Sequence, residues 1–235
     1  MEIAELGNGV KVFMYKEDKF NSCGVAVLLR RRLTRDEVTA NALLVNVMGL
    51  GCRKYRSPAE LNRAADRLFG GCFDCVNMKK GNWQLSEFYA ETVNKGDNVK
   101  NTLKFLGDII LKPLTVGKGF KPEYVEREKQ ALKSIIYSVK DNKKDYAKRK
   151  LEEKMFIDEG YGIYGDGYIE DVDKITSEGL YRHYTDIIGT SAVDTIAVGN
   201  FDKNEFLTAA EGLNLKGQRT ETDNKKEFKK KDTSY

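Results

Sequence analysis

Two strand-like runs in this sequence are joined by so short a link that they have to lie side by side. Residues 72–80 (CFDCVNMKK) and 83–93 (WQLSEFYAETV) are predicted strands, and only Gly81 and Asn82 stand between them. A two-residue loop of this kind closes a β-hairpin, in which the two strands are antiparallel. The hairpin therefore predicts a sheet with antiparallel neighbours.

Three more strands are predicted from their composition. Residues 8–15 begin with the turn signal Asn8-Gly9 and then alternate apolar residues, which is typical of a half-buried strand. Residues 22–30 (SCGVAVLLR) are almost continuously apolar, which predicts a central position in the sheet. Residues 191–201 (SAVDTIAVGNF) form the last predicted strand.

Helices are predicted where apolar periodicity coincides with capping residues. Thr34 with Glu37 forms a capping-box pattern, Pro58 follows the cap residue Ser57, and Thr176 stands at another helix start. The predicted helices cover residues 34–51, 57–70, 97–114, 121–142, 143–159, 176–188 and 202–213. Since hairpins dominate the strands and the helices come in blocks, the fold class is α+β, with a mainly antiparallel β-sheet covered by helices.

Composition excludes several classes of protein. The formal net charge is +4, from 40 basic and 36 acidic residues, which is too balanced to indicate a nucleic-acid partner. No apolar run reaches the roughly 18 residues of a membrane helix, and the start MEIAELGNGV does not resemble a signal peptide. We therefore expect a cytoplasmic protein with no membrane partner, in which Cys23, Cys52, Cys72 and Cys75 form no disulfide framework.

The 235 residues suit one large domain followed by a polar segment. Residues 1–215 contain all the predicted elements, and residues 216–235 (KGQRTETDNKKEFKKKDTSY) are polar and charged. We expect the second segment to be a linker or a tail rather than part of the packed domain.

Several strings, taken in order, carry a family resemblance. NGVKVFMY opens the chain, and LTRDEVTANALLVNVMGLGCRKYRSPAEL joins one helix to the start of the next. RAADRLFGGCFDCVNMKKGNWQLSEFYAETV, YVEREKQALKSIIYSVKDN and the closing YGDGYIEDVDKITSEGLYRHYTDIIGTSAVDTIAVGNFD follow. Over nearly the whole chain, these resemble the N-terminal domain of the pitrilysin/insulinase zinc peptidases, the inverzincins with an H-x-x-E-H motif. The resemblance implies a metallopeptidase-like (LuxS/MPP-like) domain.

The motif residues of that family are replaced in this chain. The resemblance places the two histidine ligands at Ala42 and Asn46, the catalytic glutamate at Val45 and the glutamate ligand at Ile135. Glu128 matches an acidic position often seen in the second metal-site helix, but one carboxylate does not make a metal site.

The chemistry of these replacements can be stated from the residues alone. Positions i, i+3 and i+4 share a helix face, so Ala42, Val45 and Asn46 stand where a metal would have to bind. Alanine and valine carry no metal donor, and an asparagine amide is a poor zinc ligand. His183 is the only histidine of the chain, so no two-histidine site can form. We expect no metal, no cofactor and no catalytic residue, with the apolar residues packed as a plug.

The resemblance implies a non-catalytic subunit rather than an enzyme. In this family, domains occur in pairs along a chain and enclose a peptide chamber, and some members pair a zinc-bearing subunit with a degenerate one. The chain looks like the degenerate partner, as in the gene pairs of Gram-positive bacteria, which implies a heterodimer. Two alternatives stay open: an active metal-dependent peptidase with an unrecognised site, and a purely structural subunit of a larger complex.

Other motifs favour structural roles. Cys72 and Cys75 form a C-x-x-C on a strand, where positions i and i+3 point to opposite faces, so a metal or redox pair is the weaker interpretation. His183 is interpreted as a structural histidine, because no nucleophile stands in a recognisable setting. The glycine-rich segment 160–168 lacks a phosphate-loop lysine, so it is either a peptide-facing loop or a mobile one. The basic runs 30–35 and 226–231 are interpreted as solvated faces.

Overall fold

The computed structural model describes residues 1–68, 72–94 and 96–216, and the description below is restricted to them. Its main sheet has six strands in the order β1-β2-β8-β3-β5-β4. The strands are β1 (Glu2–Glu5), β2 (Lys11–Lys16), β3 (Ser22–Arg32), β4 (Phe73–Lys80), β5 (Trp83–Val93) and β8 (Ala192–Gly199). All neighbours are antiparallel except β2 and β8, which pair in parallel. The predicted α+β class with a mainly antiparallel sheet is confirmed.

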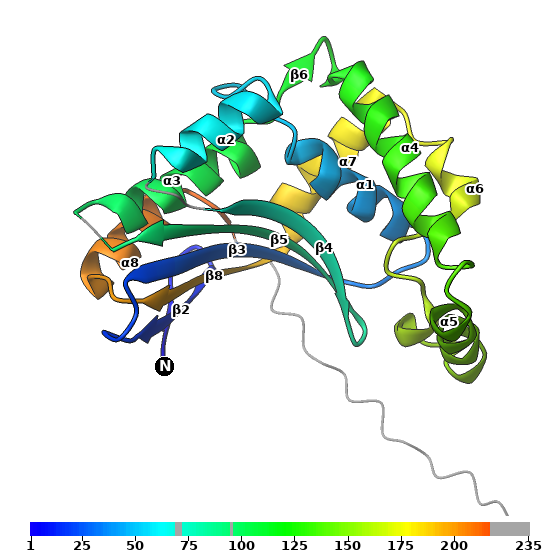
Figure 1. Cartoon of the computed structure of the whole chain (residues 1–235), viewed down its shortest axis with the longest axis horizontal. Coiled ribbons are helices and arrows are strands. Elements are labelled where there is room, and N and C mark those ends of the chain that lie inside the picture. The colour runs from blue at the N-terminus through cyan, green and yellow to red at the C-terminus, as the bar shows by residue number, and fades with distance from the viewer. Residues whose placement is uncertain (69–71, 95, 217–235) are drawn as a thin grey trace, which may run out of the picture.

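The helices form a layer over one face of this sheet (Figure 1). They are α1 (Val38–Met48), α2 (Pro58–Asp66), α3 (Asn98–Leu111), α4 (Pro122–Ser138), α5 (Lys143–Met155), α6 (Ile169–Val172), α7 (Ser177–Thr190) and α8 (Lys203–Gly212). A 3-10 turn at Gly160–Gly162 and a small hairpin, β6 (Thr115–Val116) with β7 (Gly119–Phe120), complete the fold. None of the helices in the described part is both long and apolar enough to cross a membrane.

The core lies between the helices and one face of the sheet. Strand β3 alternates so that Val25, Val27 and Leu29 are buried on the helix side. Phe88 on β5 and Met14 on β2 join them from the neighbouring strands. Burial of these side chains supplies the main driving force that holds the helix layer on the sheet.

Several predicted boundaries are confirmed. The hairpin turn at Gly81 has a positive φ of 59°, a conformation that glycine adopts without strain. Ser57 caps α2, since its side chain accepts a hydrogen bond from the backbone N–H of Glu60. Thr176 caps α7 in the same way through Gly179. The predicted end of α2 at Gly70 lies outside the described residues.

The capping box at Thr34 and Glu37 was wrong. Helix α1 begins at Val38, and its cap residue Glu37 makes no side-chain capping bond. The Glu37 carboxylate is instead paired with Arg31, at 3.0 Å. The local pattern assigned the Glu37 carboxylate to capping the N-terminus of α1. In the structure it forms an ion pair with the buried Arg31 instead.

Candidate functional site

The motif face of α1 lies inside the protein. Ala42 is 3% exposed and Val45 is 1% exposed, while Asn46 is partly buried. The face is set by the helix that runs from Val38 to Met48 between the sheet and α4. Two of its three positions therefore present alkyl groups to packed protein rather than donor atoms to a cavity.

The glutamate-ligand position behaves differently. Ile135, on α4, is 46% exposed, so it does not form part of a buried plug with Ala42 and Val45, and that expectation was wrong. Glu128, seven residues earlier on the same helix, is 9% exposed, and its carboxylate lies 3.4 Å from Nε of Arg127. Burial raises the pKa of the Glu128 carboxyl above its usual range. Glu128 is thus a buried carboxyl on α4, the helix that packs against α1.

Zinc does not fit this set of residues. Ala42 and Val45 have no donor atom, and a zinc site needs at least three protein ligands. Within residues 1–68, 72–94 and 96–216, no three His, Cys, Asp or Glu side chains come together in a way that could hold a metal ion. The described residues therefore offer no zinc site at the motif face of α1.

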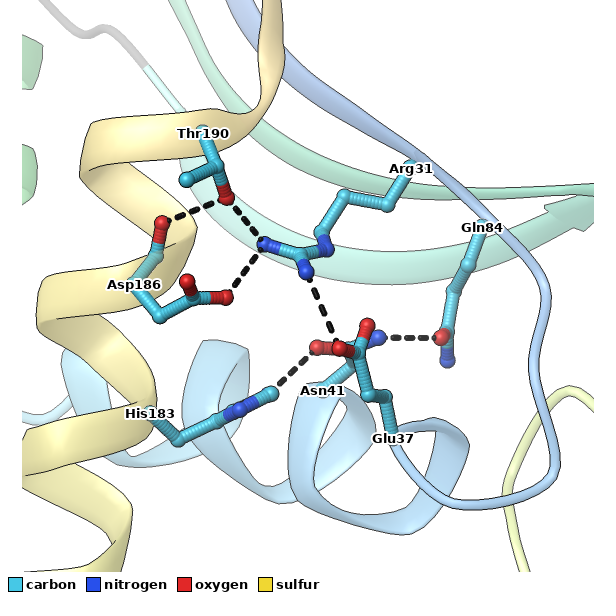
Figure 2. A network of polar contacts seen from close by, with 7 residues as sticks. All are labelled: Arg31, Glu37, Asn41, Gln84, His183, Asp186 and Thr190. Atoms are coloured by element: carbon cyan, nitrogen blue, oxygen red, sulfur yellow. Dashed lines mark hydrogen bonds and ion pairs between the residues drawn. The ribbon is translucent and has the colours of Figure 1, made fainter.

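A buried arginine organises the region next to the motif (Figure 2). Arg31 points from β3 toward the helices and is 5% exposed. Its guanidinium donates to Asp186 at 2.9 Å, to Thr190 at 2.8 Å and to Glu37 at 3.0 Å. Its Nε finds no hydrogen-bond partner among the described residues. Arg31 thus ties β3 to the start of α1 and to the last turns of α7.

The only histidine of the chain extends this network along α1. The imidazole Nε2 of His183 lies 2.7 Å from Oδ1 of Asn41, and the Asn41 amide donates to Oε1 of Gln84 at 2.7 Å (Figure 2). The Gln84 amide in turn donates to the backbone oxygens of Val38 and Gly165, both at 3.1 Å. Since Asn41 Oδ1 can only accept, Nε2 of His183 carries the proton.

Burial and a neighbouring positive charge disfavour the protonated form of this histidine. Burial lowers the pKa of His183 below its ordinary value, and the positive charge of Arg31 acts in the same direction. Glu37 and Asp186 act against this shift. Because Nε2 of His183 donates its hydrogen bond to Asn41, the imidazole has a structural role. Among the described residues, no serine or cysteine nucleophile is hydrogen-bonded to it.

Sequence reasoning missed Arg31, Asn41 and Gln84, although one signal was available. Residues 25, 27 and 29 face the core, so the two-residue period places Arg31 on the same side. An inward arginine on a buried strand needs acidic partners, which the chain supplies from α7 and from the start of α1. The identity of those partners depends on the fold and could not be read locally.

The glycine-rich segment, residues 160–168, forms hydrogen bonds with this network and with α1. Gly165 accepts hydrogen bonds from Gln84 and from Asn77, and the backbone N–H of Tyr168 donates to the Thr39 hydroxyl at 3.0 Å. A Cβ at Gly167, whose φ is 82°, would lie 2.4 Å from that hydroxyl oxygen. The segment is therefore docked on α1 and β4, with the Tyr168 ring under the Arg35 guanidinium.

A polar cavity of about 170 Å³ lies where this segment meets α5 and β4. It is lined by Asn77, Lys79, Arg149, Glu152, Tyr164, Gly165 and Asp166. Lys79 donates to the Tyr161 carbonyl at 2.5 Å and lies 3.6 Å from Glu152, while Arg149 is paired with Asp166. Burial lowers the pKa of Lys79. The cations and anions of the cavity therefore already neutralise each other.

The remaining motifs have structural surroundings. Cys72 is exposed and Cys75 is partly buried, both are free thiols, and burial raises the pKa of the Cys75 thiol well above its ordinary value. The interpretation of run 30–35 as a solvated face was wrong at Arg31, which is 5% exposed. In the same run, Arg30 is paired with Asp194, and Arg35 is paired with Glu170 and Asp171. The basic run 226–231 lies outside the described residues.

Comparison with known proteins finds one curated relative and several solved structures of similar fold. No family model matches the chain. It is 29% identical over 225 residues to the "Probable inactive metalloprotease YmfF" of Bacillus subtilis (strain 168), covering 93% of this chain and 53% of the relative. Among solved structures, a conserved protein from Enterococcus faecalis V583 superposes with a TM-score of 0.86 at 22% identity, over 92% of this chain and 53% of that one.

A second solved structure of similar fold is that of a peptidase M16 domain. A peptidase M16 inactive domain from Pseudomonas fluorescens superposes with a TM-score of 0.74 at 15% identity, over 92% of this chain and 51% of that one. The fold is that of the M16, or pitrilysin-type, peptidases, and the resemblance inferred from the sequence is confirmed. The chain spans about half the length of the relatives that it matches.

Proposed function

We propose that this chain, which has the M16 peptidase fold but carries no zinc ligand on its motif helix, is a non-catalytic subunit that completes a peptide chamber with a zinc-bearing homologous partner. The observation that carries this proposal is the motif face of α1, where Ala42 and Val45 are buried alkyl groups. The network from Arg31 to Gln84 supports it, because it holds the same helix in place without a metal.

The sheet also offers a place for a peptide. Strand β4 ends the sheet and, in the part of the chain that the structure describes, pairs only with β5. It lies next to α1, where Gly49 approaches Cys75 so closely that a Cβ there would lie 3.2 Å from the Cys75 Cβ. An open strand edge can pair with an extended peptide through backbone hydrogen bonds. We propose that a substrate peptide of the partner binds along β4.

The domain organisation belongs to the same proposal. Residues 1–215 form the peptidase-like domain, and residues 216–235 form the linker or tail. The relatives have nearly as much chain again beyond the part that this chain matches. The rest of the chamber would then come from a domain equivalent to the unmatched half of the relatives and from the partner subunit.

Reconstitution tests the proposal. The tagged chain is expressed in the organism that encodes it and purified from that organism. Mass spectrometry then identifies any co-purifying protein with an intact H-x-x-E-H motif. Peptide hydrolysis is then measured for the chain, for the partner and for both together. The proposal requires that the chain alone is inactive and that it raises the partner's activity. Chelator-sensitive hydrolysis by the chain alone would support an active enzyme instead.

A structural role in a larger assembly is the second candidate. The observation in its favour is a neighbour from the Candida albicans complex III2, which superposes with a TM-score of 0.62 at 17% identity over 93% of this chain. This alternative requires a stable assembly in which the chain neither binds peptides nor changes hydrolysis. Peptide binding that is lost when β4 is altered would exclude it.

A further inference from the structure

The polar cavity between α5, β4 and the glycine-rich segment is large enough to hold one side chain of a bound molecule. Its volume of about 170 Å³ is several times the roughly 30 Å³ that one water molecule occupies in the liquid. It is also similar to the roughly 150 Å³ of a protein cavity that holds one benzene molecule. A polar side chain of medium length therefore fits in this space.

Strand β4 forms one wall of the cavity with its helix-facing side. Asn77 pairs with Ser86, and Lys79 pairs with Gln84, whose amide donates to the Val38 carbonyl of α1. Residues 77 and 79 therefore point toward the helix layer, where they line the cavity. A peptide residue that pairs with either position has its side chain on the same face, with the Cβ atoms roughly 5 Å apart. A peptide along β4 thus brings a side chain to the cavity.

The hydrogen-bonding capacity that is left in the cavity belongs mainly to acceptors. The Asn77 amide nitrogen donates to the Gly165 carbonyl at 3.0 Å, and Lys79 donates to the Tyr161 carbonyl at 2.5 Å. In contrast, Oδ1 of Asn77 is buried and has no hydrogen-bond partner in the part of the chain that the structure describes. The Glu152 carboxylate lies 3.6 Å from Nζ of Lys79, which is longer than an ordinary N–H···O hydrogen bond. A ligand that fits this cavity must therefore donate.

The charges of the lining balance, which disfavours a cationic donor. Lys79 and Arg149 are positive, and Glu152 and Asp166 are negative. Burial lowers the pKa of Lys79, and the positive charge of Arg149 acts in the same direction, while Glu152 opposes the shift. A third cation would lose its hydration without gaining a carboxylate of its own. A neutral donor avoids this cost.

A carboxamide is the neutral group that uses this cavity most fully. Its two N–H groups can donate to Oδ1 of Asn77 and to the Glu152 carboxylate, and its oxygen can accept from Lys79, whose ammonium group has three N–H donors. A hydroxyl group supplies only one donor, and a carboxylate supplies none. Among the ordinary side chains, glutamine and asparagine carry a carboxamide.

We propose that the polar cavity is a binding subsite for the carboxamide side chain of a glutamine or asparagine residue in a peptide that pairs with β4. The peptide rests on the function proposed above, whereas the preference for a carboxamide depends on the cavity alone. The chain would then contribute sequence selectivity to the peptide chamber without contributing a catalytic group.

NMR of the ¹⁵N-labelled 235-residue chain tests the subsite without a peptide or a partner subunit. The probes are the N-acetyl N-methylamides of glutamine, methionine, lysine and glutamate, which share their caps and differ only in the side chain. Methionine is the matched control, because its side chain has a similar length and no amide. We expect the glutamine probe to shift the side-chain amide signals of Asn77, with a dissociation constant of about 0.1–10 mM. The other probes should bind at least about fivefold more weakly, because they lack one or two of the hydrogen bonds.

Variants that change the charge of the cavity should change its preference, and the backbone amide signal of Gly165 reports binding in each of them. Asn77→Asp keeps an acceptor and adds a negative charge, so it should favour the lysine probe over the glutamine probe by at least about fivefold. Glu152→Gln removes a negative charge and keeps an acceptor, so it should weaken the lysine probe further and change glutamine binding by less than about twofold. Asn101→Asp makes the same change as Asn77→Asp at an exposed position of α3 outside the lining, and should leave the preference unchanged.

Three results would overturn the subsite: equal binding of the glutamine and methionine probes, no shift at Asn77 up to about 50 mM glutamine probe, or an unchanged preference in Asn77→Asp. Failure of the subsite is distinguishable from failure of the proposed function. If the glutamine probe binds selectively but the chain does not raise a partner's peptide hydrolysis, the chamber function fails and the carboxamide subsite stands. If the chain raises hydrolysis but its cavity does not distinguish the probes, the subsite fails alone.

Discussion

At the scale of single residues, the buried Arg31 cation organises the polar contacts beside the start of α1. Arg31 lies in a low-dielectric interior, where an unpaired charge is costly, and its two carboxylate partners are each partly exposed. The partners can rehydrate when a bond is broken, whereas Arg31 cannot. Removal of both carboxylates should therefore lower the free energy of unfolding by more than the exposure of Glu37 and Asp186 suggests.

Combining Glu37→Gln with Asp186→Asn should lower the free energy of unfolding by about 2–4 kcal/mol, because it leaves the Arg31 charge buried without a counter-charge. Urea denaturation measures the change. Glu170→Gln is the matched control, since Arg35 keeps its second partner Asp171, and it should leave the midpoint unchanged. A double variant as stable as the wild type would show that Arg31 does not depend on these partners.

His183 gives the stability a pH dependence with a definite sign. Its folded-state pKa is lowered, so the unfolded chain binds more protons as the pH falls below the ordinary value of 6.5. Stability from this residue is therefore present above pH 6.5 and is lost as the pH falls toward the folded pKa. Because His183 is the only histidine, its ring proton signal in NMR reports this pKa directly. A measured pKa at or above 6.5 would contradict the buried, neutral assignment.

At the scale of the elements, the sequence predicted most helices and strands, and the failures have physical causes. The hairpin of β4 and β5 and the cap at Ser57 depend on neighbouring residues, so they were predictable. Strand β1 and the β6–β7 hairpin are too short to show a period, and they exist because of what they pair with. The parallel pairing of β2 with β8 joins segments about 180 residues apart, and no local pattern encodes it.

The cap of α2 offers a test at this scale. Ser57→Ala removes the acceptor for the Glu60 N–H and should cost about 1 kcal/mol of unfolding free energy. Ser134→Ala on α4 is the control, because its exposed hydroxyl only bonds back to the Gln130 carbonyl of the same helix. Thermal unfolding of both variants should show a lower midpoint only for Ser57→Ala. An equal shift in both would mean that the cap is not what fixes α2.

The docked glycine-rich segment gives a sharper contrast. Gly167→Ala introduces a side chain at positive φ and within 2.4 Å of the Thr39 hydroxyl, so a loss of at least about 2 kcal/mol is expected. Gly189→Ala is the matched change in α7, where nothing lies within 4 Å of the new methyl group. Helix propensity predicts a gain of about 0.5–1 kcal/mol there. If Gly167→Ala were as stable as the wild type, the segment would not be held against α1.

At the scale of the whole molecule, the fold and the replaced motif positions come from different parts of the sequence. The order of elements together with several strings of the sequence resembled an M16-type domain, and the superpositions confirm that fold. The replaced motif positions were visible in the sequence, but the network that stands beside them was not, since its members come from β3, α1, β5 and α7. The exposure of Ile135 was also missed, because the surroundings of α4 depend on long-range packing.

The central claim is that α1 has no metal site, and zinc content tests it most directly. The protein is expressed with added zinc, purified without a tag, dialysed and analysed by elemental mass spectrometry. A variant that combines Ala42→His, Val45→Glu, Asn46→His and Ile135→Glu is the positive control, because it introduces the residues that the family resemblance assigns to the zinc site. The account predicts zinc far below one equivalent in the natural chain and a higher content in the variant. One equivalent of zinc that survives dialysis in the natural chain would contradict it.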